Sequence, residues 1–383
     1  MRDLFYHDRS KNYHADEKDV RWAEMEIIMT RDNNIPEIDF VITWVDGNDP
    51  DWQKQKMEYS MQPDLSQKQD DRKERYRDWD LLRYWFRGVE RFAPWVRRIH
   101  FVTWGHLPSW LNKEHPKLNI VNHKDFIPEK YLPTFNSHAI EWNMHRIPGL
   151  AENFVYFNDD MFLLKSVKEE DFFKDGLPRD CCIETALVQD DIRNPFASML
   201  MNDAALVNMH YSKREVIKKH WKKWFNPSYG KMALRNLLML PYRDFSSFKY
   251  THLPSAFLKS TYEQLWDEEG SFLDEVCRNR FRTSFDVNQY VLKYWQYMEG
   301  KFVPQSPKIG KFYTIGLHDE QIHSAIRKQQ CHMICINDTA DVGDFEKQKK
   351  LIIQSFENIL PKKSLLLPYH YHDSIPSIFV FTE

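Results

Sequence analysis

Four short apolar runs, each ending at polar residues, constrain the fold of this chain more than any other feature. They are rich in β-branched and aromatic residues, as buried strands are, and they cover Ile38–Val45, Arg98–Trp104, Leu118–Val121 and Phe154–Phe157. Between the first two, helical spacing of apolar residues predicts an amphipathic helix over 78–92. Strands that alternate with helices predict an α/β fold in which helices flank a mostly parallel sheet.

The residues that directly follow these runs are the first indication of a functional site. They are polar or turn-forming, namely Asp46, Asn48, Asp49, Gly105, His106, Asn158, Asp159 and Asp160. In an open parallel sheet, ligands bind outside the carboxyl ends of the strands. The sequence therefore predicts a ligand site at this edge of the sheet.

Composition along the chain suggests four parts. We expect a polar N-terminal appendage at 1–35 and an α/β part that binds the ligand at 36–200. A mostly helical insertion is expected at 201–300, and a C-terminal part that completes the α/β core at 301–383. The last part contains a short predicted strand, Met333–Ile336, which leads into Asn337 and Asp338.

Composition also excludes several classes of protein. Thirteen Trp, 18 Tyr and 26 Phe among 383 residues exclude disorder. A formal charge of −3 gives no overall attraction to nucleic acid or to an anionic membrane, so an anionic ligand needs a local basic site. Five cysteines, an odd number, are interpreted as reduced thiols. With no signal-like or membrane-spanning apolar stretch, we expect an intracellular protein.

Asn158-Asp159-Asp160 is the strongest single candidate for chemistry. Carboxylate oxygens are the ligands that Mg²⁺ and Mn²⁺ prefer, and here they interrupt an apolar run that continues to Leu164. Charge in a buried segment is costly without a partner, which favours a cation held against an anionic ligand. The alternative is a turn in which Asp159 or Asp160 caps a helix.

Two other polar segments stay open between a functional and a structural role. The turn at 46–50 can contact a nucleotide sugar through its amides and carboxylates, or it can be an ordinary Gly/Pro turn. Glu141 and His145 are predicted to share one helical face. They would act there in acid–base chemistry or sugar-hydroxyl binding, or form a polar surface pair.

The second half of the chain supplies a histidine and a set of cations. A His-Leu-Pro segment beginning at His252 is predicted to open a helix, and it precedes Arg278, Arg280 and Arg282. Arginine binds phosphoryl oxygens bidentately, although alternating arginines also occur on solvated faces. The basic stretch 213–223 is interpreted as a solvated helix, with an acceptor-binding or membrane-surface patch as the alternative. The absence of GxxxxGK[ST] argues against a P-loop enzyme.

Taken together, these segments resemble the Stealth family of sugar-phosphate transferases. That family includes bacterial capsule polymerases and the catalytic subunit of the lysosomal-enzyme N-acetylglucosamine-1-phosphotransferase. The resemblance rests on IDFVITWVDGNDP at 38–50, on a long block over 78–160, on FNPSYG with the segments around His252 and Arg282, and on ICIND at 334–338. Residues 255 and 283–286 match the family pattern only in part. The resemblance implies a glycosyltransferase-A-like or Rossmann-like sheet.

The resemblance also implies a site. Four residues correspond to the family's catalytic Glu, Asp, His and Arg, namely Glu141, Asp160, His252 and Arg282. Mg²⁺ or Mn²⁺ would be held by Asp160, Asn337 and Asp338. Contacts with the nucleotide-sugar donor are expected from Trp44, Val45, Asp46, Gly47, Asn158 and Asp159.

The implied reaction is the attack of an acceptor sugar hydroxyl on the β-phosphorus of a UDP-sugar. UMP is released, and a hexose- or N-acetylhexosamine-1-phosphate remains in a phosphodiester of a capsular polysaccharide or exopolysaccharide. The cation would neutralise the pyrophosphate, and Arg282 would stabilise charge on the transferred group. Either His252 or Glu141 would take the proton of the hydroxyl.

Two other functions remain possible on the sequence alone. They are a conventional metal-dependent glycosyltransferase that releases UDP, and a non-catalytic polysaccharide-assembly protein. The expected partners are a UDP-sugar donor and an oligosaccharide or polysaccharide acceptor, with no nucleic acid. We expect a cytoplasmic location, with peripheral contact at the inner face of the membrane through 213–223.

Overall fold

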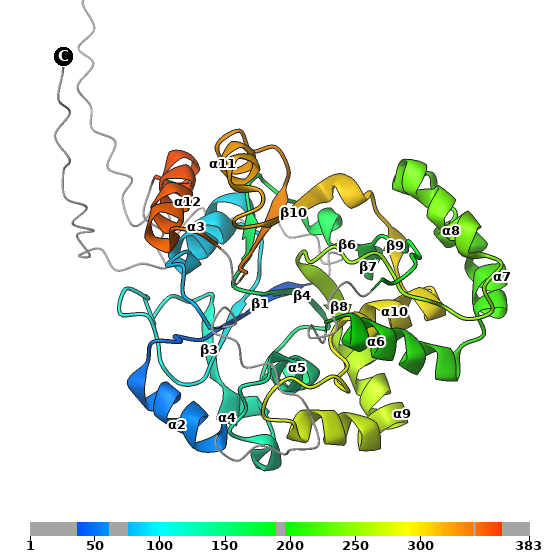
Figure 1. Ribbon diagram of the computed structural model, residues 1–383, viewed down its shortest axis with the longest axis horizontal. Coiled ribbons are helices and arrows are strands. Elements are labelled where there is room, and N and C mark those ends of the chain that lie inside the picture. The colour runs from blue at the N-terminus through cyan, green and yellow to red at the C-terminus, as the bar shows by residue number, and fades with distance from the viewer. Residues whose placement is uncertain (1–36, 61–75, 189–195, 340–341, 362–383) are drawn as a thin grey trace, which may run out of the picture. The chain divides into compact units, whose positions relative to one another are not determined.

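The central sheet confirms the predicted parallel arrangement. In the computed structural model, four parallel strands lie in the order β3-β2-β1-β4, and β8 pairs antiparallel with β4 (Figure 1). Their bounds are Ile38–Trp44 for β1, Ile99–Thr103 for β2, Leu118–Asn122 for β3, Asn153–Phe157 for β4 and Ser255–Leu258 for β8. The protein therefore has an α/β fold, as its sequence predicts.

The structure describes residues 37–60, 76–188, 196–339 and 342–361. Its helices are α2 (Pro50–Ser60), α3 (Leu82–Phe92), α4 (His123–Phe126), α5 (Ser137–Trp142), α6 (Phe196–His210), α7 (Lys213–Trp224), α8 (Ala233–Met239), α9 (Lys259–Arg278), α10 (Tyr290–Glu299), α11 (Asp319–Arg327) and α12 (Phe345–Ile359). Short 3-10 helices cover Glu129–Tyr131, Met144–Arg146, Glu169–Asp171, Pro227–Met232 and Pro307–Ile309. Among these described helices, none has the length and apolar character that a bilayer crossing requires. The predicted N-terminal appendage at 1–35 lies outside the described residues.

Each face of the sheet is covered by its own set of helices. Phe40 and Ile42 of β1 pack on one face in a core cluster with residues of α3, α11 and α12. Val41, which points the opposite way, packs in a second cluster with residues of α5, α9 and α10. Figure 1 shows α3, α11 and α12 above the sheet and α5 and α9 below it. Since β1 is buried on both faces, it is mostly apolar, as central parallel strands are, with Asp39 and Thr43 as its polar residues.

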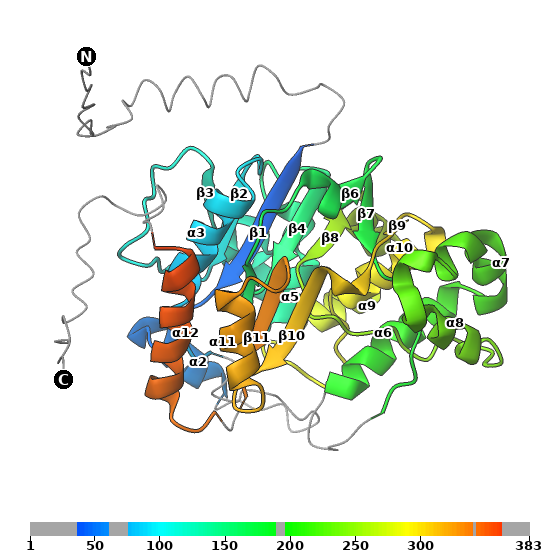
Figure 2. The same cartoon turned by 90° about the horizontal axis from the view of Figure 1, so that it is seen from above.

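A second sheet joins the middle of the chain to its C-terminal part. It contains β5 (Met161–Leu163), β11 (Met333–Asn337) and β10 (Gly310–Thr314), with β11 antiparallel to β5 and parallel to β10. Figure 2 shows β10 and β11 side by side in front of the central sheet. The Ile336 N–H donates to the Asp160 carbonyl at 2.9 Å. This pairing brings the residues after β11 next to those after β4.

A third, small sheet lies beside the central one. It consists of β6 (Phe173–Lys174), β7 (Leu177–Asp180) and β9 (Val303–Pro304). β6 and β7 pair antiparallel, and β7 and β9 pair parallel. It supports the core and adds no residue to the site described below.

Two predictions about helices were wrong. His252 leads into strand β8 and does not open a helix, because residues 255–258 pair with β4 and complete the central sheet. Glu141 and His145 do not share a helical face, because α5 ends at Trp142 and His145 lies in a separate 3-10 turn. There the His145 ring stacks on Tyr262, and burial lowers its pKa to about 3.

Candidate active site

A pocket of about 490 Å³ lies at the carboxyl ends of β1 and β4. The chain runs outward from β1 to β2 and β3, and then returns to the other side of β1 as β4. Where the strand order reverses, loops leave two adjacent strands in opposite directions and open a crevice that binds ligands in α/β proteins. The pocket is therefore at the place where the predicted ligand site was expected.

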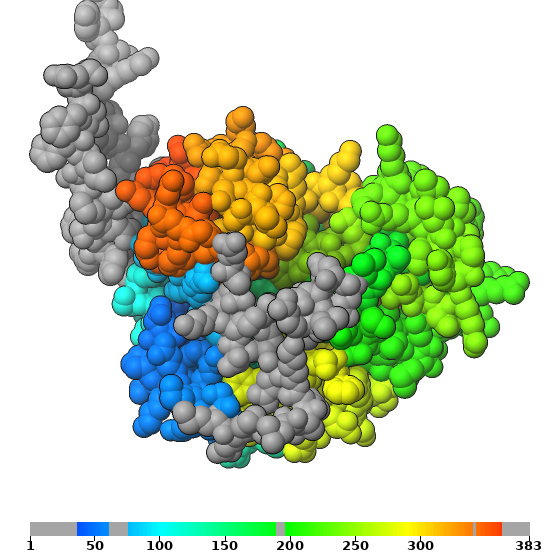
Figure 3. Space-filling view, viewed as in Figure 1, coloured from blue at the N-terminus to red at the C-terminus, as the bar shows by residue number. Residues whose placement is uncertain are grey.

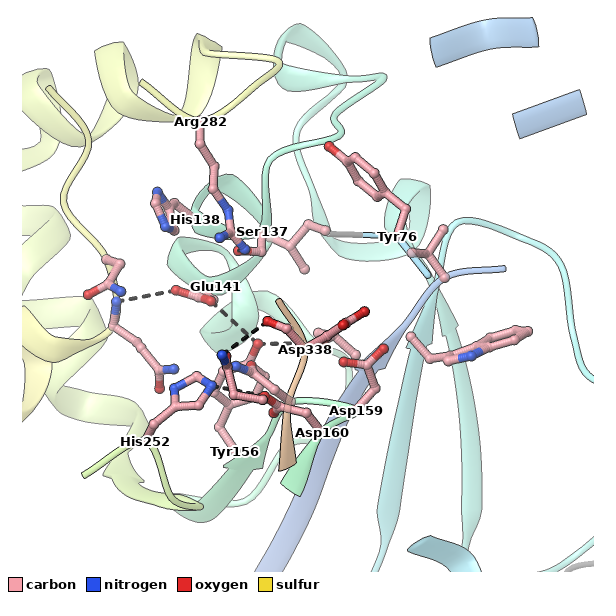
Figure 4. Close-up of a pocket in the computed structure, with 18 of the residues that line it drawn as sticks. Tyr76, Ser137, His138, Glu141, Tyr156, Asp159, Asp160, His252, Arg282 and Asp338 are labelled. Atoms are coloured by element: carbon pink, nitrogen blue, oxygen red, sulfur yellow. Dashed lines mark hydrogen bonds and ion pairs between the residues drawn. The ribbon is translucent and has the colours of Figure 1, made fainter. Parts of the chain in front are cut away.

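This pocket brings together most of the predicted site residues. Those that line it are Trp44, Val45, Glu141, Asn158, Asp159, Asp160, His252, Arg282, Asn337 and Asp338. They come from the ends of β1, β4 and β11, from α5, from the segment before β8 and from the loop between α9 and α10. Figure 4 shows Asp159, Asp160, Asp338 and His252 on one side of the pocket and Arg282 on the other, with Glu141 between.

Asp46 and Gly47 do not line the pocket. The Asp46 N–H donates to His106 Nε2 at 2.7 Å, and the Asp46 carboxylate accepts from the Asn48 N–H at 2.9 Å. A Cβ on Gly47 would lie 1.9 Å from the Tyr76 carbonyl oxygen, so only glycine fits there. These contacts give both residues a structural role in the turn.

Carboxylates gather at one end of the pocket. Desolvation within the pocket, and then the negative charges of Asp160, Asp78 and Asp338, raise the pKa of Asp159, although the residue keeps an exposed surface. Oδ1 of Asp160 is buried and has no hydrogen-bond partner among the described residues. Buried polar atoms are normally satisfied, and a cluster of carboxylate oxygens suits a divalent cation that prefers oxygen ligands.

The second carboxylate oxygen of Asp160 is held by two neighbours. Its Oδ2 lies 3.1 Å from His252 Nε2 and 3.2 Å from Cys335 Sγ. Burial raises the pKa of Cys335 well above its usual value, so the group stays a thiol and donates to Asp160. Asp160, His252 and Cys335 together could also hold a metal ion. Because the thiol is protonated, we interpret Cys335 as a hydrogen-bond donor to Asp160.

His252 is fixed on three sides. Its Nδ1 lies 3.2 Å from the Tyr290 hydroxyl, and its ring stacks on Tyr250 with the centroids 5.1 Å apart. Its backbone has a φ of 40°, in the left-handed region that non-glycine residues seldom adopt. Such strained conformations are found at functional sites, where the surrounding structure imposes them.

Glu141 is buried in the wall of the pocket, with 4% of its surface exposed. One carboxylate oxygen accepts from the Tyr156 hydroxyl at 3.4 Å, and the other accepts from the Gln289 N–H at 3.3 Å. Among the described residues, no lysine or arginine forms an ion pair with it. A carboxylate oxygen can accept two hydrogen bonds, so each oxygen has room for one from a substrate hydroxyl.

Arg282 is the one arginine of its predicted cluster that lines the pocket. Its Nη2 donates to the Ser137 hydroxyl at 2.7 Å, and within the described part of the chain no carboxylate pairs with it. Arg278 pairs with Asp274, and Arg280 donates to the Pro133 carbonyl. The charge of Arg282 is therefore available to an anion.

The family models match where the first two blocks were expected. "Stealth protein CR1, conserved region 1" matches residues 36–64, and "Stealth protein CR2, conserved region 2" matches residues 75–180. A Streptococcus pneumoniae protein named capsular polysaccharide phosphotransferase WcwK is 41% identical over 330 residues, which cover 85% of this chain and 98% of that protein. A Lactiplantibacillus plantarum protein named exopolysaccharide phosphotransferase cps2G is 38% identical over 86% of this chain and 95% of its own length.

The chain belongs to the Stealth family. It is a transferase of phosphorus-containing groups, as the resemblance implied. Among solved structures, the galactosyltransferase LgtC with donor and acceptor sugar analogues is 8% identical, with a TM-score of 0.35 over 82% of this chain and 95% of that one.

Asp286 holds the site of this Stealth protein together, and sequence reasoning did not single it out. It is fully buried and accepts from Asn136 Nδ2 at 2.9 Å, His138 Nδ1 at 3.0 Å and Thr283 Oγ1 at 2.8 Å. Burial acts to raise its pKa, but the bonds from His138 and Thr283 outweigh burial and lower it. These bonds tie the loop that carries Arg282 to the start of α5, which carries Glu141.

Other pocket residues were also missed. Arg77, whose Nη1 lies 3.4 Å from Asp338 Oδ1, directly precedes the predicted helix. Tyr290 lines the pocket beside His252. The five cysteines are buried and none forms a disulfide, so the one that contacts Asp160 could not be told from the others by sequence.

Proposed function

We propose that this Stealth protein transfers a sugar-1-phosphate from a UDP-sugar to a hydroxyl of an oligosaccharide or polysaccharide acceptor, releasing UMP. The product would be a phosphodiester of a capsular polysaccharide or exopolysaccharide, in keeping with the names of its relatives. The observation that carries the proposal is that Glu141, Asp160, His252 and Arg282 meet in one pocket. The proposal includes a cytoplasmic location, since the donor is a cytosolic nucleotide sugar.

Asp160, Asn337 and Asp338 would hold Mg²⁺ or Mn²⁺. The unpartnered Asp160 Oδ1 fits a cation of this kind, and so does the raised pKa of Asp159, which comes from desolvation and then from the neighbouring carboxylates. When bound, the cation would supply positive charge beside the diphosphate. Asp160 would keep its orientation through the Cys335 thiol, which donates to its other oxygen.

Arg282 would bind the oxygens of the transferred phosphoryl group. Its partner in the structure is the neutral Ser137 hydroxyl, so its positive charge is not cancelled. Negative charge spreads over these oxygens as the phosphoryl group moves. A donor aimed at such charge typically contributes a factor of about 10² to 10³ in rate.

His252 is the residue to which we assign the role of base. As the acceptor oxygen forms its bond to the β-phosphorus, its proton would pass to His252 Nδ1, because Nε2 donates its N–H to the Asp160 carboxylate. The bond from the β-phosphorus to the bridging oxygen would break, and its electron pair would leave with UMP. The imidazolium formed would lie 3.1 Å from the Asp160 carboxylate, which would stabilise it. Glu141 would then bind a hydroxyl of the donor sugar.

The first experiment separates this reaction from ordinary glycosyl transfer. UMP and UDP would be measured from UDP-N-acetylglucosamine with Mg²⁺ and a capsule oligosaccharide, for the wild type, for Asp160→Ala, and for Asp267→Ala, an exposed aspartate on α9. We expect acceptor-dependent UMP that is lost with Asp160→Ala and kept with Asp267→Ala. Release of UDP would mean a conventional glycosyltransferase. If the donor is turned over at a rate that depends neither on the acceptor nor on the substitution of Asp160, the assigned site is wrong.

A second experiment separates the roles of Glu141 and His252. We expect His252→Asn to lower kcat by about 10² to 10⁴, the usual contribution of a positioned base, and to leave the Kd of the donor nearly unchanged. Glu141→Gln should weaken donor binding, measured by calorimetry. The opposite pattern would make Glu141 the base.

A further inference from the structure

Exposed apolar side chains are concentrated on and after α8. Five large ones stand out within residues 234–242 and are 42 to 65% exposed, namely Leu234, Leu237, Leu238, Leu240 and Tyr242. Trp221 of α7 is also exposed, at 57%. Positions i, i+3 and i+4 lie on the same side of a helix, so Leu234, Leu237 and Leu238 form one apolar face. Concentrated exposed apolar surface marks an interaction site.

The opposite side of α8 is fixed to the protein by polar contacts. Asn236 Nδ2 donates to the carbonyls of Cys182 at 2.8 Å and Trp224 at 2.6 Å, and its Oδ1 accepts from the Glu184 N–H at 2.6 Å. Lys213 Nζ donates to the Met239 carbonyl at 2.7 Å. Because these bonds are buried, α8 cannot roll to turn its leucines inward. The leucines face outward as part of the folded structure.

Positive charge surrounds these leucines. Residues 213–243 contain nine Lys and Arg and one acidic residue, Glu215, a formal charge of +8 in a chain whose total is −3. Seven of these cations are exposed, namely Arg214, Lys218, Lys219, Lys222, Lys231, Arg235 and Arg243. In Figures 1 and 3, this light-green segment forms the right-hand edge of the view, away from α11 and α12. None of its residues lines the pocket.

We propose that residues 213–243, the α7–α8 face, dock on an anionic phospholipid bilayer. Exposed leucines and tryptophan with adjacent lysines match the chemistry of the boundary between headgroups and acyl chains. A free polyanion would contact the lysines and leave the leucines in water. A second copy of the chain, seated face to face, would bring two strongly positive surfaces together. The sequence predicted peripheral membrane contact from the positive charge of 213–223 alone. The leucines of α8 add an apolar contribution to that contact.

Vesicle flotation without substrates tests this proposal independently of the reaction. The vesicles would be equal parts phosphatidylglycerol and phosphatidylcholine, with pure phosphatidylcholine for comparison. The apolar variant is Leu234→Gln/Leu237→Gln/Leu238→Gln, and its matched control replaces exposed apolar residues elsewhere, Met57→Gln/Val188→Gln/Leu317→Gln. The charge variant is Lys218→Gln/Lys219→Gln/Lys222→Gln, and its control is Lys113→Gln/Lys124→Gln/Lys328→Gln.

We expect the wild type to float with the anionic vesicles and to be released by salt. The charge variant should bind about 100-fold more weakly, at the usual contribution of each lysine near an anionic surface. The apolar variant should bind about tenfold more weakly than the wild type, and both controls should bind as the wild type does. Thermal unfolding and the transfer rate with a water-soluble acceptor should be unchanged in all four.

Three results would overturn the proposal. The first is a wild type that does not bind the anionic vesicles, and the second is an apolar variant that binds them as well as its control does. The third is a wild-type dimer, seen by light scattering, that the apolar variant converts to a monomer, since a second copy would then cover the face. If flotation is seen but no sugar phosphate is transferred, the proposed reaction fails and the docking surface stands.

Discussion

Asp39 and Asp160 lie near opposite ends of two paired strands, and their surroundings are nearly opposite. Asp39, near the start of β1, accepts from Arg97 Nε at 2.8 Å, from His100 Nε2 at 2.9 Å and from the Ala151 N–H at 2.9 Å. Burial acts to raise its pKa, but the bonds from His100 and Arg97 prevail and lower it. Asp160, after β4, has one oxygen without a partner among the described residues, and its charge contributes to the raised pKa of the adjacent Asp159.

The difference shows what each end of the sheet does. A buried aspartate whose two oxygens both accept hydrogen bonds from the protein, one of them from a paired arginine, stabilises the fold. A partly buried aspartate beside like charges costs folding free energy, and a cation from outside would offset that cost. Both ends contain an aspartate and a histidine. The two ends differ in how fully the hydrogen-bonding capacity of the aspartate is used by the protein, and this separates the structural site from the proposed functional one.

The largest effect should come from Asp160→Asn. Because it removes a ligand of the proposed cation, we expect the transfer rate to fall by about 10³ or more. Stability in urea without metal should be unchanged or higher, since a like charge next to Asp159 disappears. A variant that unfolds more easily and keeps its rate would place Asp160 in the same class as Asp39.

Asp39→Asn should give the reverse result. Breaking a buried ion pair costs about 3 to 5 kcal/mol, so we expect the urea midpoint to fall strongly. The transfer rate per folded molecule should stay within about twofold of the wild type, because Asp39 is remote from the pocket lining. Asp267→Asn, on the surface of α9, is the control for the loss of one charge.

Both ends of the sheet should lose stability in acid, the Asp39 end because the pKa of Asp39 is lowered and the pocket end because it contains a buried histidine. Burial lowers the pKa of His123 to about 4, with a further effect of His106. As pH falls from 6.5 to 4, the unfolded state takes up a proton that the folded state does not, so the free energy of unfolding falls by about 3 kcal/mol. His123→Asn should remove this part of the slope. Urea unfolding at pH 7 and pH 4.5 measures it, and an equal slope in both proteins would show that His123 titrates normally.

The smallest effect should come from Asp46→Ala. Its carboxylate accepts from the Asn48 N–H and does not line the pocket. We expect kcat/KM for the donor to change by less than about threefold, and stability by about 1 kcal/mol. A loss of about a hundredfold would restore Asp46 to the donor site and show that the turn moves when the donor binds.

Local sequence patterns predicted the strands and the carboxylates that follow them, because a central strand needs a run of β-branched and aromatic residues. They did not predict β8, whose four residues, Ser255–Leu258, form a strand only by pairing with β4, about a hundred positions earlier. The role of Asp286 depends on three partners from two segments. The turn at Asp46 looked like the one at Asp159, but its hydrogen-bonding groups are used within the turn and by His106.

The pairing of β5 with β11 also sets the time at which the protein can become active. β5 is made soon after β4, whereas β11 and Asp338 are made more than 160 residues later. Chains fold from the N-terminus during synthesis, so the parallel strands can associate while the set of carboxylates is still incomplete. A ribosome that stops before Met333 would release a chain with its four parallel strands but without Asn337 and Asp338. The order of synthesis thus delays assembly of the proposed cation site until β11 and the residues after it have been made.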